Sequence, residues 1–140
     1  MIPGSFTADI FRLMVIHKYG GIYNDQGNTY IKQIDEVVKT SDRYVSILDF
    51  SEKGGDANSS SVNNCMLAAY RNNPIVEFCL DHLINNVRTD YYGVNFLDPT
   101  GPKGVGRAFN RFQGYHDDEL IKRGEYNIGS EKIKLLYYDF

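Results

Sequence analysis

The chain has 140 residues, a formal net charge of −3 and a hydrophobic fraction of 42%. This length suits one domain or part of one, and the composition is that of an ordinary globular protein. The small charge, without a block of Lys or Arg, argues against a nucleic-acid partner bound through its phosphates. No apolar run is long enough for a membrane span, and the first residues lack the pattern of a signal peptide, so we expect a cytoplasmic location.

The first predicted element is a helix that ends at about Tyr19 and is capped at its start by Ser5 or Thr7. Gly20 is placed to end this helix as a left-handed residue. Apolar residues cover most of the helix circumference, so we expect burial on several sides. These residues are Phe6, Ile10, Phe11, Leu13, Met14, Val15 and Ile16.

A short strand over residues 21–24 follows the helix, and extended chain over 28–31 comes after a turn. The pattern then predicts a short helical turn over 34–38 and an alternating, β-rich strand over 42–50. The polar, glycine-rich residues 51–61 indicate a surface loop.

A further strand is predicted over 62–70, and Pro74 is placed at the first position of a long helix. Residues 91–106 contain several turn-forming residues, so we expect a loop there. A helix over 105–112 and a last strand over 132–140 complete the chain. Strands and helices alternate, which favours an α/β fold with helices on the faces of a sheet, in one domain spanning residues 1–140.

Asp9 and Arg12 are three residues apart and therefore share one face of the first helix. A simple intrahelical ion pair is one interpretation, because such pairs are common and weak. On an otherwise apolar helix, however, a charged pair is costly unless its groups have partners, and a polar ligand would be one. The glycine turn brings Tyr23 and Asp25 to the carboxyl end of the next strand, where ligands bind in open α/β sheets.

The order of these residues is more specific than any one of them. Residues 8–25 read "ADIFRLMVIHKYGGIYND". This stretch resembles the pattern Asp-x-x-Arg, then Leu-x-x-x-Gly-Gly-x-Tyr-x-Asp-x-Asp, of glycosyltransferases with a DXD sugar-binding region, which include glycosyltransferase family 32, capsular polysaccharide synthesis enzymes and initiating mannosyltransferases. The stretches "NNCMLAAYRNNPIVEFCLDHLINNV" and "LDPTGP" are also similar to that family, so the resemblance runs from about residue 6 to about residue 107.

The resemblance implies the GT-A fold, a Rossmann-like α/β sheet that binds a nucleotide sugar. By position, Asp9 and Arg12 would be catalytic-site residues that hold the hydroxyls of the donor sugar, and Tyr23 would line the same pocket. Asp25 would match the first Asp of the DXD motif, which contacts the sugar or ribose and helps to ligate a metal ion.

One departure from the family pattern concerns the metal. The second Asp of the motif falls on Gly27, so a carboxylate that the family uses to bind Mn²⁺ or Mg²⁺ is missing. Gln26 or Asn28 could offer a neutral oxygen to such a cation instead. We therefore expect Asp25 to be the metal residue, with weaker metal binding than the family pattern provides.

Four further polar residues are weaker candidates. Asn63 and Asn64 could contact the donor or the acceptor, or could simply form a polar strand end. Asp98 and Thr100, in the stretch "LDPTGP", could approach the acceptor, or could form only an Asp-Pro turn.

The resemblance implies a glycosyltransferase of polysaccharide biosynthesis, which moves a hexose from a donor such as UDP-glucose or GDP-mannose to a glycan or other acceptor, with retention of anomeric configuration. Few residues precede Asp9, where family members have further nucleotide-binding strands, so we expect a domain that is incomplete at both ends. A second hypothesis is an inactive remnant that binds a carbohydrate or nucleotide sugar. A third is a structural α/β domain whose Asp9–Arg12 pair is only an ion pair. The sequence does not indicate an oligomeric state.

Overall fold

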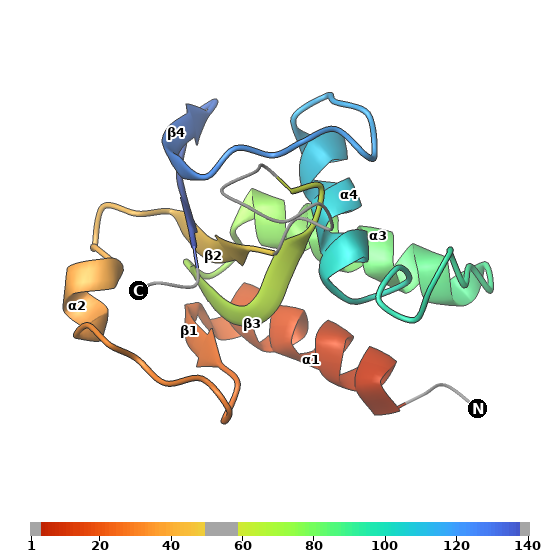
Figure 1. Cartoon of the computed structure of the whole chain (residues 1–140), viewed down its shortest axis with the longest axis horizontal. Helices are drawn as coiled ribbons and strands as arrows, with labels where there is room; N and C mark the ends of the chain where they lie inside the picture. The colour runs from red at the N-terminus through yellow and green to blue at the C-terminus, as the bar shows by residue number, and fades with distance from the viewer. Residues whose placement is uncertain (1–3, 50–58, 138–140) are drawn as a thin grey trace.

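The computed structural model of the chain describes residues 4–49 and 59–137, shown in Figure 1. Its helices are α1 (Gly4–Tyr19), α2 (Ile34–Val37), α3 (Pro74–Arg88) and α4 (Pro102–Phe112). Its strands are β1 (Gly21–Asn24), β2 (Tyr44–Leu48), β3 (Val62–Ala69), β4 (Gly124–Ile128) and β5 (Glu131–Leu136). No helix within the described residues is long and apolar enough to cross a membrane.

The strands form one mixed sheet in the order β1-β3-β2-β5-β4. Only the β2–β5 pair is parallel, and the other neighbouring pairs are antiparallel. The predicted α/β class is therefore confirmed. Because β1 runs antiparallel to β3, the carboxyl end of β1 meets the beginning of β3 rather than the end of a parallel neighbour.

The main core lies between the sheet and the helices α1, α3 and α4, of which α3 packs against both α1 and α4. Leu13, Leu83 and Phe109 come from these three helices, and Tyr44 and Ile133 come from the sheet. A smaller cluster on the other face contains Val45, Ile47, Met66 and Ala68. In Figure 1, α2 lies apart from the other helices, across the strands. The fold thus has one well-covered sheet face and one thinly covered face.

The helix α1 is buried on one side only, so the prediction of burial on several sides was wrong. Leu13 and Ile16 face the core, whereas Phe11 is 61% exposed and Met14 is 50% exposed. The physical reason is the position of α1 at the rim of the helical layer, where it packs on α3, β1 and β3. Apolar character around a helix therefore did not indicate how many neighbours it has.

Gly20 ends α1 as predicted. Its φ is +69°, and its N–H donates to the carbonyl oxygen of Ile16 at 2.8 Å. A Cβ at this position would lie 2.6 Å from the backbone nitrogen of Arg71, so a side chain does not fit. This close approach joins the end of α1 to the turn that follows β3.

The predicted start of α3 is also confirmed. Pro74 is its first residue, and the side-chain oxygen of Asn73 accepts hydrogen bonds from the N–H groups of Ile75 and Val76. The helix α4 begins at Pro102, three residues before the predicted start. It crosses the chain just before β3 so closely that a Cβ on Gly106 would collide with the carbonyl oxygen of Ser60.

The end of the chain differs most from the prediction. The expected strand over 132–140 is β5, which ends at Leu136, and residues 138–140 lie outside the described range. The strand β4 was not predicted, because its half-buried pattern and polar residues give a weak apolar signal. A two-residue turn at Gly129-Ser130, with φ of +59° at Gly129, was the signal for this hairpin.

The remaining strand predictions are confirmed with shorter bounds, since β2 and β3 lie within 42–50 and 62–70. Residues 28–31 contain no strand. Most of the predicted polar loop, residues 51–58, lies outside the described residues. Ser59, near its end, forms an isolated bridge with Ile121.

Candidate functional site

Arg12 is the centre of a polar cluster at the edge of the sheet. It is only 8% exposed, and its Nη1 donates to the backbone oxygen of Asn64 at 2.8 Å. The same Nη1 lies 3.5 Å from Oδ1 of Asp25, and Nη2 lies 3.3 Å from Oδ1 of Asp9. The guanidinium carbon is 4.9 Å from the ring centroid of Tyr23. The buried guanidinium of Arg12 thus joins α1, the end of β1 and the beginning of β3.

Both carboxylate oxygens of Asp9 have fixed partners. Oδ1 accepts a hydrogen bond from Nδ2 of Asn64, and Oδ2 accepts one from the hydroxyl of Thr100, each at 3.0 Å. Burial raises the pKa of Asp9, while Arg12 and these two hydrogen bonds oppose that rise. Asp9 is therefore held in one orientation by Arg12 of its own helix and by groups from two other parts of the chain.

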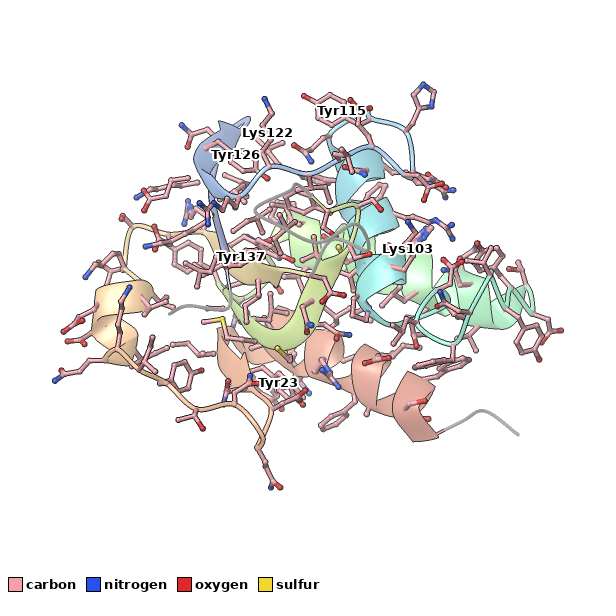
Figure 2. All side chains as sticks on the ribbon, in the orientation of Figure 1. Tyr23, Lys103, Tyr115, Lys122, Tyr126 and Tyr137 are labelled. Carbon is pink, nitrogen blue, oxygen red and sulfur yellow. The ribbon has the colours of Figure 1, made fainter. Side chains whose placement is uncertain are left out.

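Asp25 is the most accessible acid of the cluster, with 39% of its side chain exposed. It follows β1 directly, and its N–H donates to the carbonyl oxygen of Cys65 at 2.8 Å. Its Oδ1 accepts a hydrogen bond from the Tyr23 hydroxyl at 2.6 Å, whereas its Oδ2 makes no hydrogen bond or ion pair within the described residues. Figure 2 shows Tyr23 where β1 and α1 meet. The free oxygen of Asp25 is thus available to a ligand.

Tyr23 contributes a hydroxyl that stays protonated at neutral pH. Burial and the hydrogen bond to Asp25 raise the pKa of Tyr23. Because the phenol donates to one oxygen of Asp25 and its ring faces Arg12, the side chain fixes both partners. The predicted meeting of Asp9, Arg12, Tyr23 and Asp25 at one place is therefore observed.

The two consecutive asparagines of β3 have different positions. Asn64 joins the Arg12 cluster, whereas Nδ2 of Asn63 donates to Asp49 at 3.2 Å and its oxygen accepts from the N–H of Cys65. Alternation along a strand explains the difference, because neighbouring residues point to opposite faces of a sheet. Of these two predicted residues, only Asn64 lies in the site.

Asn28 lies next to the site but holds the turn after β1. Its Nδ2 donates to Oδ1 of Asn24 at 2.9 Å and to the carbonyl oxygen of Cys65 at 3.1 Å. These bonds fix the turn that contains Gly27 against β3. Asn28 thus stabilises the turn that follows Asp25.

The residues present offer few ligands to a divalent cation. The described part of the chain contains no group of three or more His, Cys, Asp or Glu side chains that could hold a metal. Gly27 supplies no side chain, and Oδ1 of Asp25 is already bonded to Tyr23. Since Mg²⁺ and Mn²⁺ take about six oxygen ligands, only a cation that brings most of them with a phosphate ligand and water fits here.

Asp98 and Thr100 are both completely buried. Neither can therefore touch an acceptor directly, contrary to that interpretation of the sequence. Asp98 pairs with Arg107 of α4 and accepts a hydrogen bond from the N–H of Val94 at 2.8 Å. Thr100 donates to Asp9 instead. The stretch "LDPTGP" did point to these residues, but no local signal links Thr100 to a residue 91 positions away.

Comparison with protein families matches residues 1–97 to the model of capsular polysaccharide synthesis proteins. The chain belongs to this family. The matched residues include Asp9, Arg12, Tyr23, Asp25 and Asn64 and end before Thr100 and α4. The predicted resemblance to glycosyltransferases with a DXD region, which include capsular polysaccharide synthesis enzymes, is thereby confirmed at the level of the family.

The solved structure of the PaToxG glycosyltransferase is similar to this member of the capsular polysaccharide synthesis family. The TM-score is 0.52 at 22% sequence identity, over 76% of this chain and 34% of that chain. At this identity the likeness shows the fold, which is the α/β fold of a glycosyltransferase. The chain spans about a third of the length of that structure. A search of curated proteins gave no significant match.

Proposed function

We propose that the chain carries the sugar-binding part of a glycosyltransferase, which transfers a hexose from a nucleotide-diphosphate sugar to a glycan acceptor. The main support is the convergence of Asp9, Tyr23 and Asp25 on the buried guanidinium of Arg12. The carboxylate of Asp25 is half-exposed and paired with the fixed guanidinium of Arg12. Such an arrangement suits the recognition of sugar hydroxyls. The family and the fold support glycosyl transfer in general.

In this proposal Asp25 is the residue that touches the donor sugar. Its free Oδ2 accepts a hydrogen bond from a hydroxyl of the hexose, while Arg12 and Tyr23 hold the other oxygen in place. As the bond from the anomeric carbon to the diphosphate oxygen breaks, positive charge develops on the sugar. The nearby negative charge of Asp25 stabilises that charge, and its fixed geometry means that little reorganisation is needed.

Asp9 and Asn64 act as positioning residues in the same proposal. Asn64 bonds both Asp9 and Arg12, so it links the two charges across α1 and β3. We propose retention of anomeric configuration, with the acceptor oxygen entering on the face that the diphosphate leaves and its proton passing to the departing phosphate oxygen. Asp9 is not free to act as a covalent nucleophile, because both of its carboxylate oxygens accept hydrogen bonds, and this supports the route.

A divalent cation, Mn²⁺ or Mg²⁺, is proposed to enter with the diphosphate of the donor. Asp25 is the residue that would hold this cation, and Gly27 provides no second carboxylate for it. Such a cation would stabilise the negative charge of the leaving diphosphate. The family pattern, which has two acidic residues in the motif, predicts tighter binding of the metal ion than this sequence offers.

The alternative is a chain that binds a nucleotide sugar or carbohydrate without turning it over. The glycine at position 27 favours this alternative, because it removes one carboxylate from the metal position. UDP-glucose and GDP-mannose, each with and without Mn²⁺, separate the two when both hydrolysis and binding are followed on the 140-residue chain. Turnover that is lost in Asp25→Asn supports transfer, and saturable binding without turnover supports the alternative. A folded chain that neither binds nor turns over either donor contradicts both.

A further inference from the structure

A pocket of about 530 Å³ lies between the end of α4 and the strand β4. This volume falls in the range of sites that bind small molecules. Figure 2 places its residues Tyr115 and Tyr126 on the opposite side of the molecule from Tyr23. None of the residues that line it belongs to the Arg12 cluster. The pocket is therefore separate from the proposed donor site.

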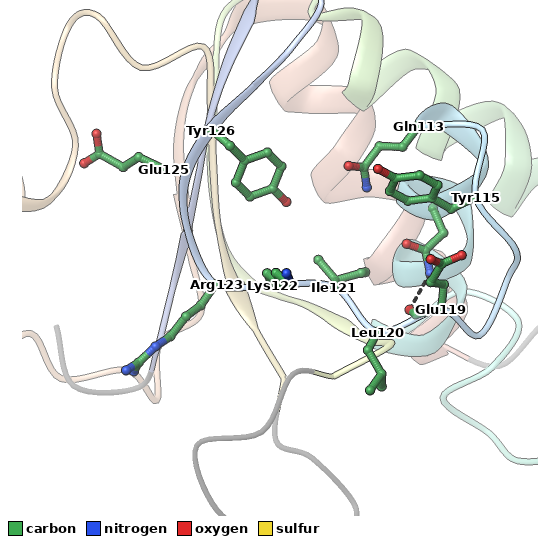
Figure 3. Close-up of a pocket in the computed structure, with 10 residues that line it drawn as sticks. Gln113, Tyr115, Glu119, Leu120, Ile121, Lys122, Arg123, Glu125 and Tyr126 are labelled. Carbon is green, nitrogen blue, oxygen red and sulfur yellow. Dashed lines mark hydrogen bonds between the residues drawn. The ribbon is translucent and has the colours of Figure 1, made fainter.

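Two tyrosines stand on different sides of this pocket. Figure 3 shows Tyr126 projecting from β4 and Tyr115 beside Gln113 near the end of α4. Tyr115 is 53% exposed, so its ring is open to a ligand. Burial raises the pKa of Tyr126, so its hydroxyl remains a hydrogen-bond donor over the physiological range. Tyrosines with an apolar ring face and a polar tip suit ligands that carry both C–H surfaces and hydroxyls.

Asn110 adds a buried acceptor to the wall of the pocket. Its Nδ2 donates to the carbonyl oxygens of Asp117 and Glu119 at 3.2 and 2.8 Å, which fixes the orientation of the amide. Its Oδ1 is buried and has no hydrogen-bond partner within the described residues. Such acceptors are uncommon and unfavourable, and a hydroxyl group of a bound ligand would supply the missing donor.

The charges around the pocket do not favour an anion. Glu125 lies 3.3 Å from Lys134 and 3.5 Å from Lys132, and Figure 3 shows its side chain turned away from Tyr126. The guanidinium of Arg123 packs on the ring of Tyr137 and also points away. Glu119 and Lys122, the other charged residues of the lining, have opposite signs. The open space therefore carries amides, phenols and balanced charge, as expected for a neutral polar ligand.

We propose that this pocket is a saccharide site, which binds one neutral sugar unit of a glycan away from the donor. The sugar stacks on the ring of Tyr115, and its hydroxyls bond the Tyr126 hydroxyl and the amides of Gln113 and Asn110. The inference goes beyond the proposed function and does not depend on it, because binding at this pocket requires no turnover.

The test is a titration of the 140-residue chain with methyl glucoside, methyl mannoside and N-acetylglucosamine, followed by NMR of backbone and side-chain amides. Inorganic phosphate is the anionic comparison. We expect at least one sugar to shift the side-chain amide signals of Asn110 and Gln113 together with backbone signals of the pocket. Tyr115→Ala should weaken this binding about tenfold, because it removes the stacking surface.

Matched variants keep the proposal falsifiable. Tyr92→Ala removes another exposed tyrosine far from the pocket lining and should leave the sugar affinity unchanged. Donor turnover is followed separately from the NMR signals of this pocket, so a failure of the proposed transfer reaction would be distinguishable from a failure of this site. The proposal is overturned if no sugar shifts these signals, if phosphate alone does so, or if binding is equal in the Tyr115→Ala and Tyr92→Ala chains.

Discussion

The hydroxyl of Thr100 lies 3.0 Å from Oδ2 of Asp9, although 91 positions separate the two residues. Thr100 is completely buried just before α4, in a loop that Asp98 anchors by pairing with Arg107 of that helix. The carboxylate on α1 is therefore held partly by a loop outside the residues that match the family model. The hydrogen bond from Thr100 lowers the pKa of Asp9 and so favours its ionised form.

Thr100→Val should move the acidic limb of the pH dependence of kcat/KM to higher pH. The threonine hydroxyl stabilises the ionised carboxylate, so its loss raises further a pKa that burial already holds above the usual Asp value. Ionised Asp9 is then reached only at a higher pH. Initial rates from acid to neutral pH measure the limb, and Thr100→Ser, which keeps the hydroxyl, should restore it. Coincident limbs in all three chains would contradict the prediction.

Arg12→Met should lower the free energy of unfolding by about 3–5 kcal/mol, because two carboxylates and a carbonyl lose their buried cationic partner. Urea unfolding followed by circular dichroism gives the difference. Arg88→Met is the matched control, since Arg88 is exposed at the end of α3 and its loss should change the stability by less than about 0.5 kcal/mol. Similar unfolding midpoints for the two variants would show that Arg12 does not bind the cluster together.

Asp25→Asn should reduce the turnover of the donor sugar by about 100-fold or more while the fold stays intact. The substitution keeps the size of the side chain but removes the charge proposed to stabilise the transition state. Asp35→Asn, at an exposed acid of α2, should keep full activity. Donor hydrolysis by all three chains is the measurement, and unchanged turnover in Asp25→Asn would remove Asp25 from the proposed mechanism.

Gly27→Asp should raise the affinity for Mn²⁺ in the presence of UDP roughly tenfold, because it restores a second carboxylate to the motif. A Cβ at position 27 has no atom within 4 Å, so the turn has space for the new side chain. Gly27→Ala controls for the loss of glycine. Calorimetric titration with Mn²⁺ decides the matter, and equal affinities in the Asp and Ala variants would count against a cation beside Asp25.

Gly20→Ala should destabilise the chain by about 1–3 kcal/mol, because φ is positive at this residue and the new Cβ would press on the backbone nitrogen of Arg71. Gly4→Ala is the comparison, since no atom lies within 4 Å of a Cβ there. Thermal and urea unfolding of both chains measure the effect. A Gly20→Ala chain as stable as Gly4→Ala would mean that the turn between α1 and β1 can relax at little cost.

The end of α1 and the start of α3 were predicted well, whereas Ser5 and Thr7 lie inside α1 and do not cap its start. Gly20 ended the first helix, and Asn73-Pro74 began the third, because capping and left-handed turns depend on residues within one helical turn. The strand β4 was not predicted because few of its residues are apolar, so its sequence gives only a weak strand signal. The turn Gly129-Ser130, which joins β4 to β5, is the local signal for this hairpin.

The sequence by itself determined that Asp9 and Arg12 share a helical face and that a glycine turn carries Tyr23 and Asp25 toward them, since short-range geometry fixes such relationships. Only the tertiary structure decided that Thr100 bonds Asp9, that Asn64 rather than Asn63 joins the cluster, and that Phe11 remains exposed. Those outcomes depend on strand register and on how helices pack over a mixed sheet. Both arise from contacts between distant segments, which no local pattern encodes.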